Sequence, residues 1–278
     1  MTSLDRRAAL LAALLAPITM TTLSSGSAQA AQGAADGDPQ AEPKPAPAGW
    51  FNKQHIAMLV YPRMTALDLI GPQYMFASLT GAKVHLVAKT LDPVTSDTGV
   101  TITPTTTFMD TPKDLMVLFT PGGTTGTLAA AGDEETRAFM ADRGARAQYV
   151  TSVCTGSLIL GAAGLLKGYQ ATSHWAARDI LAEYGATPVD ARVVKDRNRI
   201  TGAGVTAGLD FGLAMLAELR NDTYAQAVQL MCEYDPDPPF HAGSIHTAPN
   251  DVKATVQGIV APFQEQARAL ARDLRGPA

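Results

Sequence analysis

Short apolar runs alternate with helical patterns along most of this chain. The runs are continuous rather than alternating in polarity, which is typical of strands buried on both faces of a parallel sheet. They lie at residues 56–61, 84–88, 115–120 and 149–153. Helical patterns lie between or after them, at residues 67–79, 134–143, 157–166, 176–184, 209–219 and 224–233. This order predicts an α/β fold with an open, mainly parallel sheet and helices on both faces.

The remainder of the chain fits one domain. Residues 192–194 and 199–201 flank a polar segment and predict a hairpin, whose basic side chains we expect on a solvated surface: Arg192, Lys195, Arg197 and Arg199. Residues 250–275 are enough for one amphipathic helix. With 46% hydrophobic residues, we expect a single folded domain over 50–278. The net charge of −4 gives no electrostatic reason to expect nucleic acid.

The first thirty residues have the pattern of an export signal. Arg6-Arg7 precede an apolar stretch of Ala and Leu, and Ala28-Gln29-Ala30 forms a small-x-small cleavage site. The paired arginines resemble a twin-arginine signal, and the alternative is a Sec signal that happens to carry them. Polar residues interrupt the apolar stretch, so we expect no stable membrane anchor. We predict a periplasmic or extracellular protein with a signal over 1–30 and a flexible Pro/Ala-rich linker over 31–49.

One strand-like run ends directly on a cysteine. Residues 149–153 lead into Cys154, and an apolar helical pattern begins at Leu158. A side chain at such a strand-to-helix corner points into the cleft above the sheet, as in a nucleophile elbow. The N–H groups and positive end of the following helix favour a thiolate. We therefore interpret Cys154 as a nucleophile; the alternative is a buried small hydrophobe, the usual state of a free cysteine.

Two other groups follow strand-like runs. Asp68 follows the first run among apolar neighbours, and Gly122-Gly123 follow the third. Because ligands bind at the carboxyl ends of parallel strands, we expect these groups and Cys154 to meet in one cleft. Apolar surroundings would raise the pKa of Asp68 and suit it to carry a proton, although it could instead cap a helix. The glycine N–H groups and that of Thr155 would form an oxyanion hole, unless the glycines only make a tight turn.

The histidines and the second cysteine give weaker signals. His174 could act as a base for Cys154, but we prefer the alternative in which its ring bonds backbone at the cleft edge. His241 and His246 are five residues apart in an irregular segment, which fits no common zinc spacing, so no metal site is expected. We expect Cys232 to pack inside a helix. A disulfide between the two cysteines is not expected, because an elbow cysteine is poorly placed for one.

Several motifs of the sequence together resemble those of a known family. They are Leu67-Asp68-Leu69-x-Gly71-Pro72, Pro121-Gly122-Gly123, Val153-Cys154-Thr155-Gly156-Ser157, Ala171-Thr172-Ser173-His174-Trp175 and Gly204-Val205-Thr206-Ala207-Gly208. The later run Tyr234-Asp235-Pro236-x-Pro238-Pro239-Phe240 is the more discriminating part. Over roughly residues 56–244 the chain resembles the ThiJ/PfpI superfamily, whose flavodoxin-like fold is that of class I glutamine amidotransferases. Within it, the chain is most similar to the bacterial isocyanide hydratases.

The resemblance implies a cysteine-dependent enzyme that adds water to an isonitrile and gives an N-substituted formamide through a thioimidate. It implies that Cys154 is the nucleophile, Asp68 the proton carrier and Thr155 a supporting hydroxyl. It further implies a small-molecule substrate, no cofactor and a homodimer. Proteases of the superfamily carry histidine directly after the cysteine, where this chain has Thr155, so peptidase activity is disfavoured.

Two alternatives stay open. One is another cysteine reaction of the superfamily, of glyoxalase or amidase type. The other is a non-catalytic ligand-binding module in which Cys154 senses oxidation. Several of the motifs also resemble the sensor domains of AraC-type transcription regulators. Those proteins carry a helix-turn-helix pair downstream, whereas we expect one amphipathic helix over residues 250–275.

Overall fold

Seven strands form one sheet at the centre of the fold, in the order β10-β11-β7-β6-β1-β2-β5. The computed structural model describes residue 47 and residues 49–275. The strands are β1 (Gln54–Leu59), β2 (Ala82–Ala88), β5 (Thr106–Thr107), β6 (Val117–Thr120), β7 (Tyr149–Val153), β10 (Val193–Asp196) and β11 (Arg199–Gly202). Neighbouring strands are parallel except for β10 and β11. The predicted mainly parallel sheet and the predicted hairpin are confirmed. Arg199, which was expected on a solvated surface, is instead buried, and its Nε donates to the Leu165 carbonyl at 2.7 Å.

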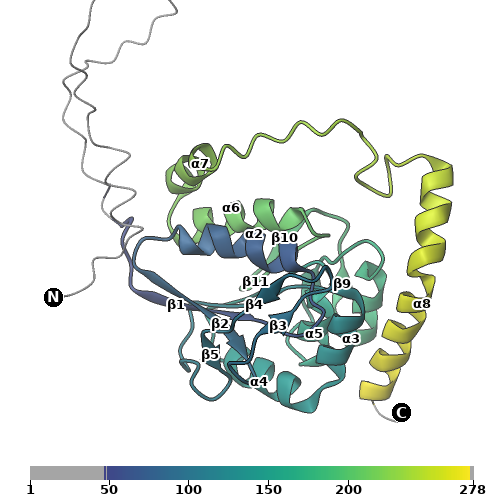
Figure 1. The fold of residues 1–278 in the computed structure, drawn as a ribbon, viewed down its shortest axis with the longest axis horizontal. Helices are drawn as coiled ribbons and strands as arrows, with labels where there is room; N and C mark the ends of the chain where they lie inside the picture. The colour runs from purple at the N-terminus through teal and green to yellow at the C-terminus, as the bar shows by residue number, and fades with distance from the viewer. Residues whose placement is uncertain (1–46, 48, 276–278) are drawn as a thin grey trace, which may run out of the picture. The chain divides into compact units, whose positions relative to one another are not determined.

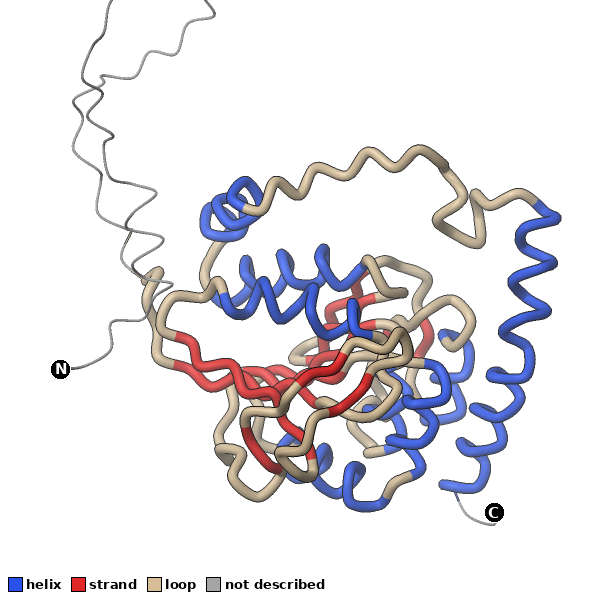
Figure 2. Tube along the Cα trace, in the orientation of Figure 1, coloured by secondary structure: helices blue, strands red, loops and turns tan. Residues whose placement is uncertain are grey.

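Helices cover both faces of the sheet (Figure 1). On one face lie α2 (Ala66–Ala77), α6 (Ala207–Leu219) and α7 (Asp222–Met231). On the other lie α3 (Thr124–Gly132), α4 (Glu134–Gly144) and α5 (Gly156–Ala162). The amphipathic helix predicted at the C-terminal end is α8 (Asn250–Arg275), which packs against α3 and the 3-10 helix η1 (Arg178–Tyr184). Figure 2 shows the long loop that joins α7 to α8.

The core between the sheet and the α2–α6 layer is aromatic. Phe76 of α2, Phe119 of β6 and Phe211 of α6 are fully buried, and their ring centroids lie 5.7–6.1 Å apart. Phe76 meets the other two rings edge to face, an arrangement that aromatic quadrupoles favour. A side chain at Gly212 would overlap Met75, so glycine lets α6 lie close to α2. This packing fixes α2, and with it the helix that carries Asp68.

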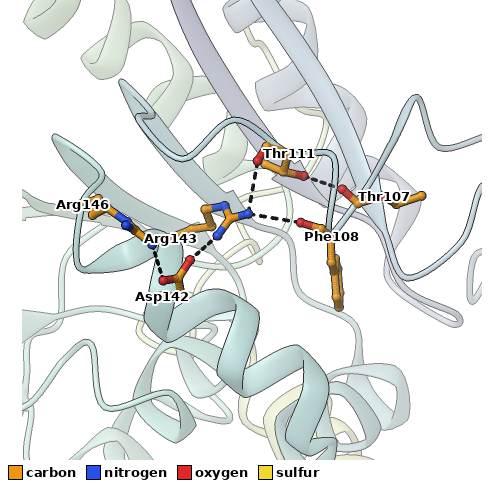
Figure 3. A network of polar contacts seen from close by, with 6 residues as sticks. All are labelled: Thr107, Phe108, Thr111, Asp142, Arg143 and Arg146. Atoms are coloured by element: carbon orange, nitrogen blue, oxygen red, sulfur yellow. Dashed lines mark hydrogen bonds and ion pairs between the residues drawn. The ribbon is translucent and has the colours of Figure 1, made fainter.

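A buried arginine ties the loop after β5 to α4 (Figure 3). Arg143 Nη2 donates to the carbonyl oxygens of Phe108 and Thr111, at 3.3 and 3.1 Å. The Phe108 ring stacks on Phe139 of α4, with centroids 4.2 Å apart. Together with this stacking, the charge-assisted bonds to two carbonyls hold the short edge strand β5 against the helix layer.

Four local details differ from the patterns. Residues 157–166 predict a longer helix than α5, which ends because Gly164 adopts a positive φ of 76°. Residues 176–184 form a 3-10 helix rather than an α-helix. Helix α3 carries no pronounced apolar stripe and was not predicted. Two short strand pairs were also not predicted: β3 (Val94–Thr95) with β4 (Thr101–Ile102), and β8 (Gln170–Ala171) with β9 (Thr187–Pro188).

The chain divides into two units, Met1–Trp50 and Phe51–Ala278. The predicted export signal over 1–30 and all but two residues of the predicted linker over 31–49 lie outside the described residues. Within the described part, no helix is long and apolar enough to cross a membrane.

Candidate active site

Cys154 lies at the corner between β7 and α5. Its φ is 56°, a left-handed conformation that is rare and strained for a residue other than glycine. The backbone N–H of Cys154 donates to the carbonyl oxygens of Gly202 and Ala203, at 3.1 and 2.8 Å, which holds the corner against the end of β11. The residue is 5% exposed. The predicted elbow is therefore present, and its strain is held by the neighbouring strand.

Three strand ends meet at this corner, because β7, β6 and β1 are neighbours in the sheet. The N–H of Gly122, after β6, donates to Asp68 Oδ2 at 3.1 Å. A Cβ at Gly122 would lie 2.8 Å from Asp68 Oδ2 and 2.8 Å from Cys154 Cβ, so glycine is required for the close approach. Asp68 is fully buried and does not cap a helix. The predicted meeting of Asp68, Gly122 and Cys154 is confirmed.

Burial raises the pKa of Asp68 to about 7. The Cys154 thiol beside the carboxylate and the N–H of Gly122 act in the opposite direction, and Asp97 raises the pKa further. The free oxygen, Oδ1, is buried and makes no aligned hydrogen bond with any described residue. Asp68 therefore holds or releases a proton near neutral pH and has one oxygen available to pass it on.

The protonation state of Cys154 differs from the predicted thiolate. Burial, and then the charge and hydrogen bond of Asp68, raise the pKa of the thiol well above its ordinary value. The backbone N–H groups of Thr155 and Val205 contact the sulfur and lower the pKa, but by less. The predicted preference for a thiolate is thus wrong for the free protein, because burial beside a carboxylate outweighs the helix N-terminus. The two N–H groups remain placed to stabilise negative charge that develops on sulfur during a reaction.

The paired glycines do not form an open oxyanion hole. The N–H of Gly122 is used by Asp68, and the N–H of Gly123 donates to Thr155 Oγ1 at 2.9 Å. Both donors are occupied within the fold, so this part of the prediction is wrong. The glycines instead position the carboxylate and the threonine that flank Cys154.

A chain of buried hydroxyl groups fixes the orientation of Thr155. Tyr61 Oη donates to the Pro121 carbonyl at 2.8 Å, and a carbonyl can only accept. Thr127 must therefore donate its proton to Tyr61, at 3.1 Å, and Thr155 must donate to Thr127, at 2.8 Å. The Thr155 hydroxyl consequently presents a lone pair, not a proton, to the remainder of the site. Tyr61 and Thr127 thus act as positioning residues behind Thr155 and the Pro121–Gly123 loop.

We expect Tyr61→Phe to lower kcat roughly tenfold. Without the phenol, the Thr127 and Thr155 protons can reorient and the loop that presents Gly122 to Asp68 is less constrained. Weakening the Gly122 bond would raise the pKa of Asp68, so the corresponding limb of the pH–rate profile should move to higher pH. Steady-state kinetics across pH measure both effects.

Tyr149→Phe is the matched control. It also removes a phenol hydroxyl, which donates to Glu218 Oε1 at 2.7 Å. Tyr149, however, is the first residue of β7 and lies at the opposite end of that strand from Cys154. The control should leave the pH profile unchanged. An unshifted profile for Tyr61→Phe, with stability alone reduced, would show that Tyr61 has only a structural role.

His174 makes no hydrogen bond to the Cys154 sulfur. The N–H of Ala176 donates to His174 Nδ1 at 3.2 Å, which places the ring proton on Nε2. Burial lowers the pKa of the ring, so it is neutral. The preferred interpretation, a ring that bonds backbone at the cleft edge, is confirmed. The neighbouring Ser173 is the closer partner, since its Oγ donates to the Cys154 carbonyl at 2.9 Å.

Cys232 and His246 make no hydrogen bond to Cys154 or Asp68. Cys232 follows the last residue of α7, is half-exposed, and is free, so its predicted place inside a helix is wrong. The helix ends at Met231, one residue too early to enclose it. His246 bonds Asp190 at 2.7 Å. Among the described residues, no group of three or more His, Cys, Asp or Glu could hold a metal ion.

Four residues that contact Cys154 or position Thr155 were not predicted from the sequence: Tyr61, Thr127, Ser173 and Val205. Ser173 and Val205 belong to motifs that were identified, yet nothing local shows that they contact Cys154. Tyr61 and Thr127 are separated by 66 residues, and only the sheet order brings their hydroxyls together.

Comparison with known proteins agrees with this geometry. Residues 54–218 match the DJ-1/PfpI family. The chain is 51% identical over 207 residues to an isonitrile hydratase of Pseudomonas putida, covering 74% of this chain and 90% of that protein. It is 66% identical to a ThiJ/PfpI family protein of Pseudomonas syringae whose crystal structure is known, with a TM-score of 0.81 and coverage of 84% and 98% of the two chains.

A more distant relative is a regulator. The chain is 27% identical over 192 residues to the HTH-type transcriptional regulator GbdR of Pseudomonas aeruginosa, covering 66% of this chain and 52% of the regulator. The similarity to regulator domains noted from the motifs is thus also found in the comparison.

Proposed function

This chain belongs to the DJ-1/PfpI family, and from that premise we propose that it is an isonitrile hydratase. The reaction adds water to R–N≡C and gives the formamide R–NH–CHO. The observation that carries the proposal is the buried pair of Cys154 and Asp68, in a chain 51% identical to an isonitrile hydratase over most of that protein's length. A carboxyl with a pKa of about 7 beside a thiol can carry a proton in both directions at neutral pH.

In the first half of the reaction, the Cys154 sulfur bonds to the terminal carbon of the isonitrile. The thiol proton passes to Asp68 and from there to the same carbon, and one carbon–nitrogen π bond is lost. The product is a thioimidate, R–N=CH–S–Cys154. The N–H groups of Thr155 and Val205, which contact the sulfur, stabilise the negative charge that sulfur carries as its proton leaves.

In the second half, Asp68 accepts a proton from water as the water oxygen bonds to the thioimidate carbon. The nitrogen takes up that proton and becomes R–NH. The carbon–sulfur bond then breaks, the carbonyl forms, and the remaining hydroxyl proton returns to sulfur. One carboxyl group thus serves as acid and then as base, and no proton is gained or lost overall.

Incubation of the purified protein with an aryl isonitrile tests the proposal. Chromatography should show the matching formamide, formed in proportion to enzyme concentration. Absence of formamide, together with stoichiometric oxidation of Cys154 by peroxide, would favour the redox-sensing alternative instead.

We propose further that the chain forms a homodimer. Leu67, Ile70 and Tyr74 lie at helical spacing on α2 and are 46%, 46% and 43% exposed. An exposed apolar stripe of this kind is typical of an interface. Sedimentation of the wild type and of Ile70→Glu tests this: the wild type should sediment as a dimer and the variant as a monomer.

We also propose that the protein is exported and processed after Ala30. The support is the arginine pair, the apolar stretch and the small-x-small site, all within the sequence of residues 1–30. Mass spectrometry of secreted material should find Ala31 or a near neighbour as the first residue, and Met1 on exported protein would contradict the cleavage site.

A further inference from the structure

A cavity of about 450 Å³ is lined by residues that contact Cys154. Val205 directs its N–H at the sulfur. Ser173 donates to the Cys154 carbonyl at 2.9 Å, and the Ala203 carbonyl accepts the Cys154 N–H at 2.8 Å. The volume falls within the range of small-molecule sites, about 300 to 1,000 Å³. Cys154 itself is not part of the lining, so the cavity lies one residue away from the nucleophile, and it is large enough for a substrate substituent.

Two arginines from different elements line this cavity. Arg178 begins η1 and forms an ion pair with Asp190. Its Nη2 group has no hydrogen-bond partner among the described residues. Arg192 precedes β10 and forms an ion pair with Asp210, which also accepts from the Tyr234 hydroxyl at 2.8 Å. Both guanidinium groups are held in place at the cavity wall by their ion pairs, and the N–H groups that these pairs leave over can donate to a ligand.

The other polar groups of the cavity wall also favour a ligand that accepts hydrogen bonds. His174 carries its proton on Nε2, and that edge of the ring lies against Gly204 in the lining, where a Cβ would be 3.4 Å from Nε2. Asp190 is the acidic residue of the lining, and its two oxygens are used by Arg178 and His246. The wall thus offers N–H donors and no unused carboxylate oxygen, which favours a ligand with acceptor oxygens.

We propose that this cavity binds the substituent of the substrate, and that the substrate is an isonitrile that carries a carboxylate. The inference rests on the proposed hydratase function. A carboxylate accepts from planar guanidinium groups in a geometry that neutral substituents cannot match, and such charge-assisted bonds are the stronger ones. Bound in this way, the substituent would hold the terminal isonitrile carbon toward Cys154.

The test compares isocyanoacetate with its methyl ester as substrates of the full-length protein. The two differ in the charge of the substituent and in one methyl group, and their products are N-formylglycine and its methyl ester. For the wild type, kcat/KM should be roughly tenfold or more higher for the carboxylate. Arg178→Gln and Arg192→Gln should each lose most of that preference, because turnover of the carboxylate should fall much more than turnover of the ester; thermal unfolding reports correct folding.

Arg146→Gln is the matched control. Arg146 lies before β7, at the opposite end of that strand from Cys154, and forms an ion pair with Asp142 of α4, so its loss removes the same charge away from the cavity. The control should keep the preference for the carboxylate. A wild type that hydrates the ester as fast as the carboxylate, or variants that lose both activities equally, would overturn this inference alone. Failure to hydrate either compound or an aryl isonitrile would overturn the proposed function and this inference with it.

Discussion

Replacing Cys154 by alanine should abolish isonitrile turnover, with a loss on the order of 10⁴-fold or more. The thioimidate needs a sulfur nucleophile, and no other thiol lies at the site, since Cys232, the other cysteine of the sequence, follows α7. Alanine is smaller than cysteine and fits the buried corner. The positive φ of 56° strains both residues alike, so the fold should be kept. Formamide production, measured beside circular dichroism and thermal unfolding, checks both parts.

Cys232→Ala is the matched control for this variant. Cys232 is half-exposed and its sulfur donates to the Gln229 carbonyl at 3.4 Å, away from Cys154, so its removal should leave the rate unchanged. If Cys154→Ala retains more than a few per cent of the wild-type rate, covalent catalysis is not the main route.

Asp68→Asn should lower the chemical rate roughly 100-fold, the usual scale for loss of a general acid–base group. The amide keeps the shape of the carboxyl group, and its oxygen can still accept from Gly122, so the local structure should persist. The amide, unlike the carboxyl group, cannot take up or release a proton near neutral pH. Substrate binding should survive, and single-turnover kinetics separate it from the chemical step.

The Cys154 titration gives an independent measurement on the same variant. The carboxylate of Asp68 raises the pKa of the thiol, so its replacement by a neutral amide should lower that pKa. Asp222→Asn, an exposed change in the first turn of α7, is the control and should alter neither rate nor titration. If Asp68→Asn keeps a near wild-type rate and an unchanged pKa of the Cys154 thiol, Asp68 has only a structural role.

Stability should depend on pH through the same carboxyl group. Its pKa is about 7 in the folded state against an ordinary value of 3.8, so between these values the folded state retains a proton that the unfolded state has lost. The free energy of unfolding therefore falls as pH rises from about 4 to about 7, and the loss is complete above that range. Asp68→Asn cannot titrate, so from pH 4 to pH 8 it should gain stability relative to wild type, by roughly 4 kcal/mol. Urea unfolding of both proteins at the two pH values measures this difference.

The sequence by itself determined the architecture and the main site residues. Continuous apolar runs must be buried on both faces, and their alternation with helical patterns leaves few arrangements other than a parallel sheet. Because the carboxyl ends of such strands lie at one edge, Asp68, Gly122 and Cys154 were placed together without coordinates. The elbow and the C-terminal helix follow in the same way from patterns within a few residues of each other.

Only the tertiary structure decided the protonation and the surroundings of these residues. Whether a thiol beside a helix N-terminus is ionised depends on its burial and on the distance to a carboxylate, and both depend on how separate strands pack. The N–H groups of Gly122 and Gly123 are occupied by partners 54 and 32 residues away, which no local pattern encodes. The direction of the Tyr61–Thr127–Thr155 hydrogen bonds and the meeting of Arg178 and Arg192 at one cavity likewise arise from long-range packing, because their members meet only when the sheet order is set.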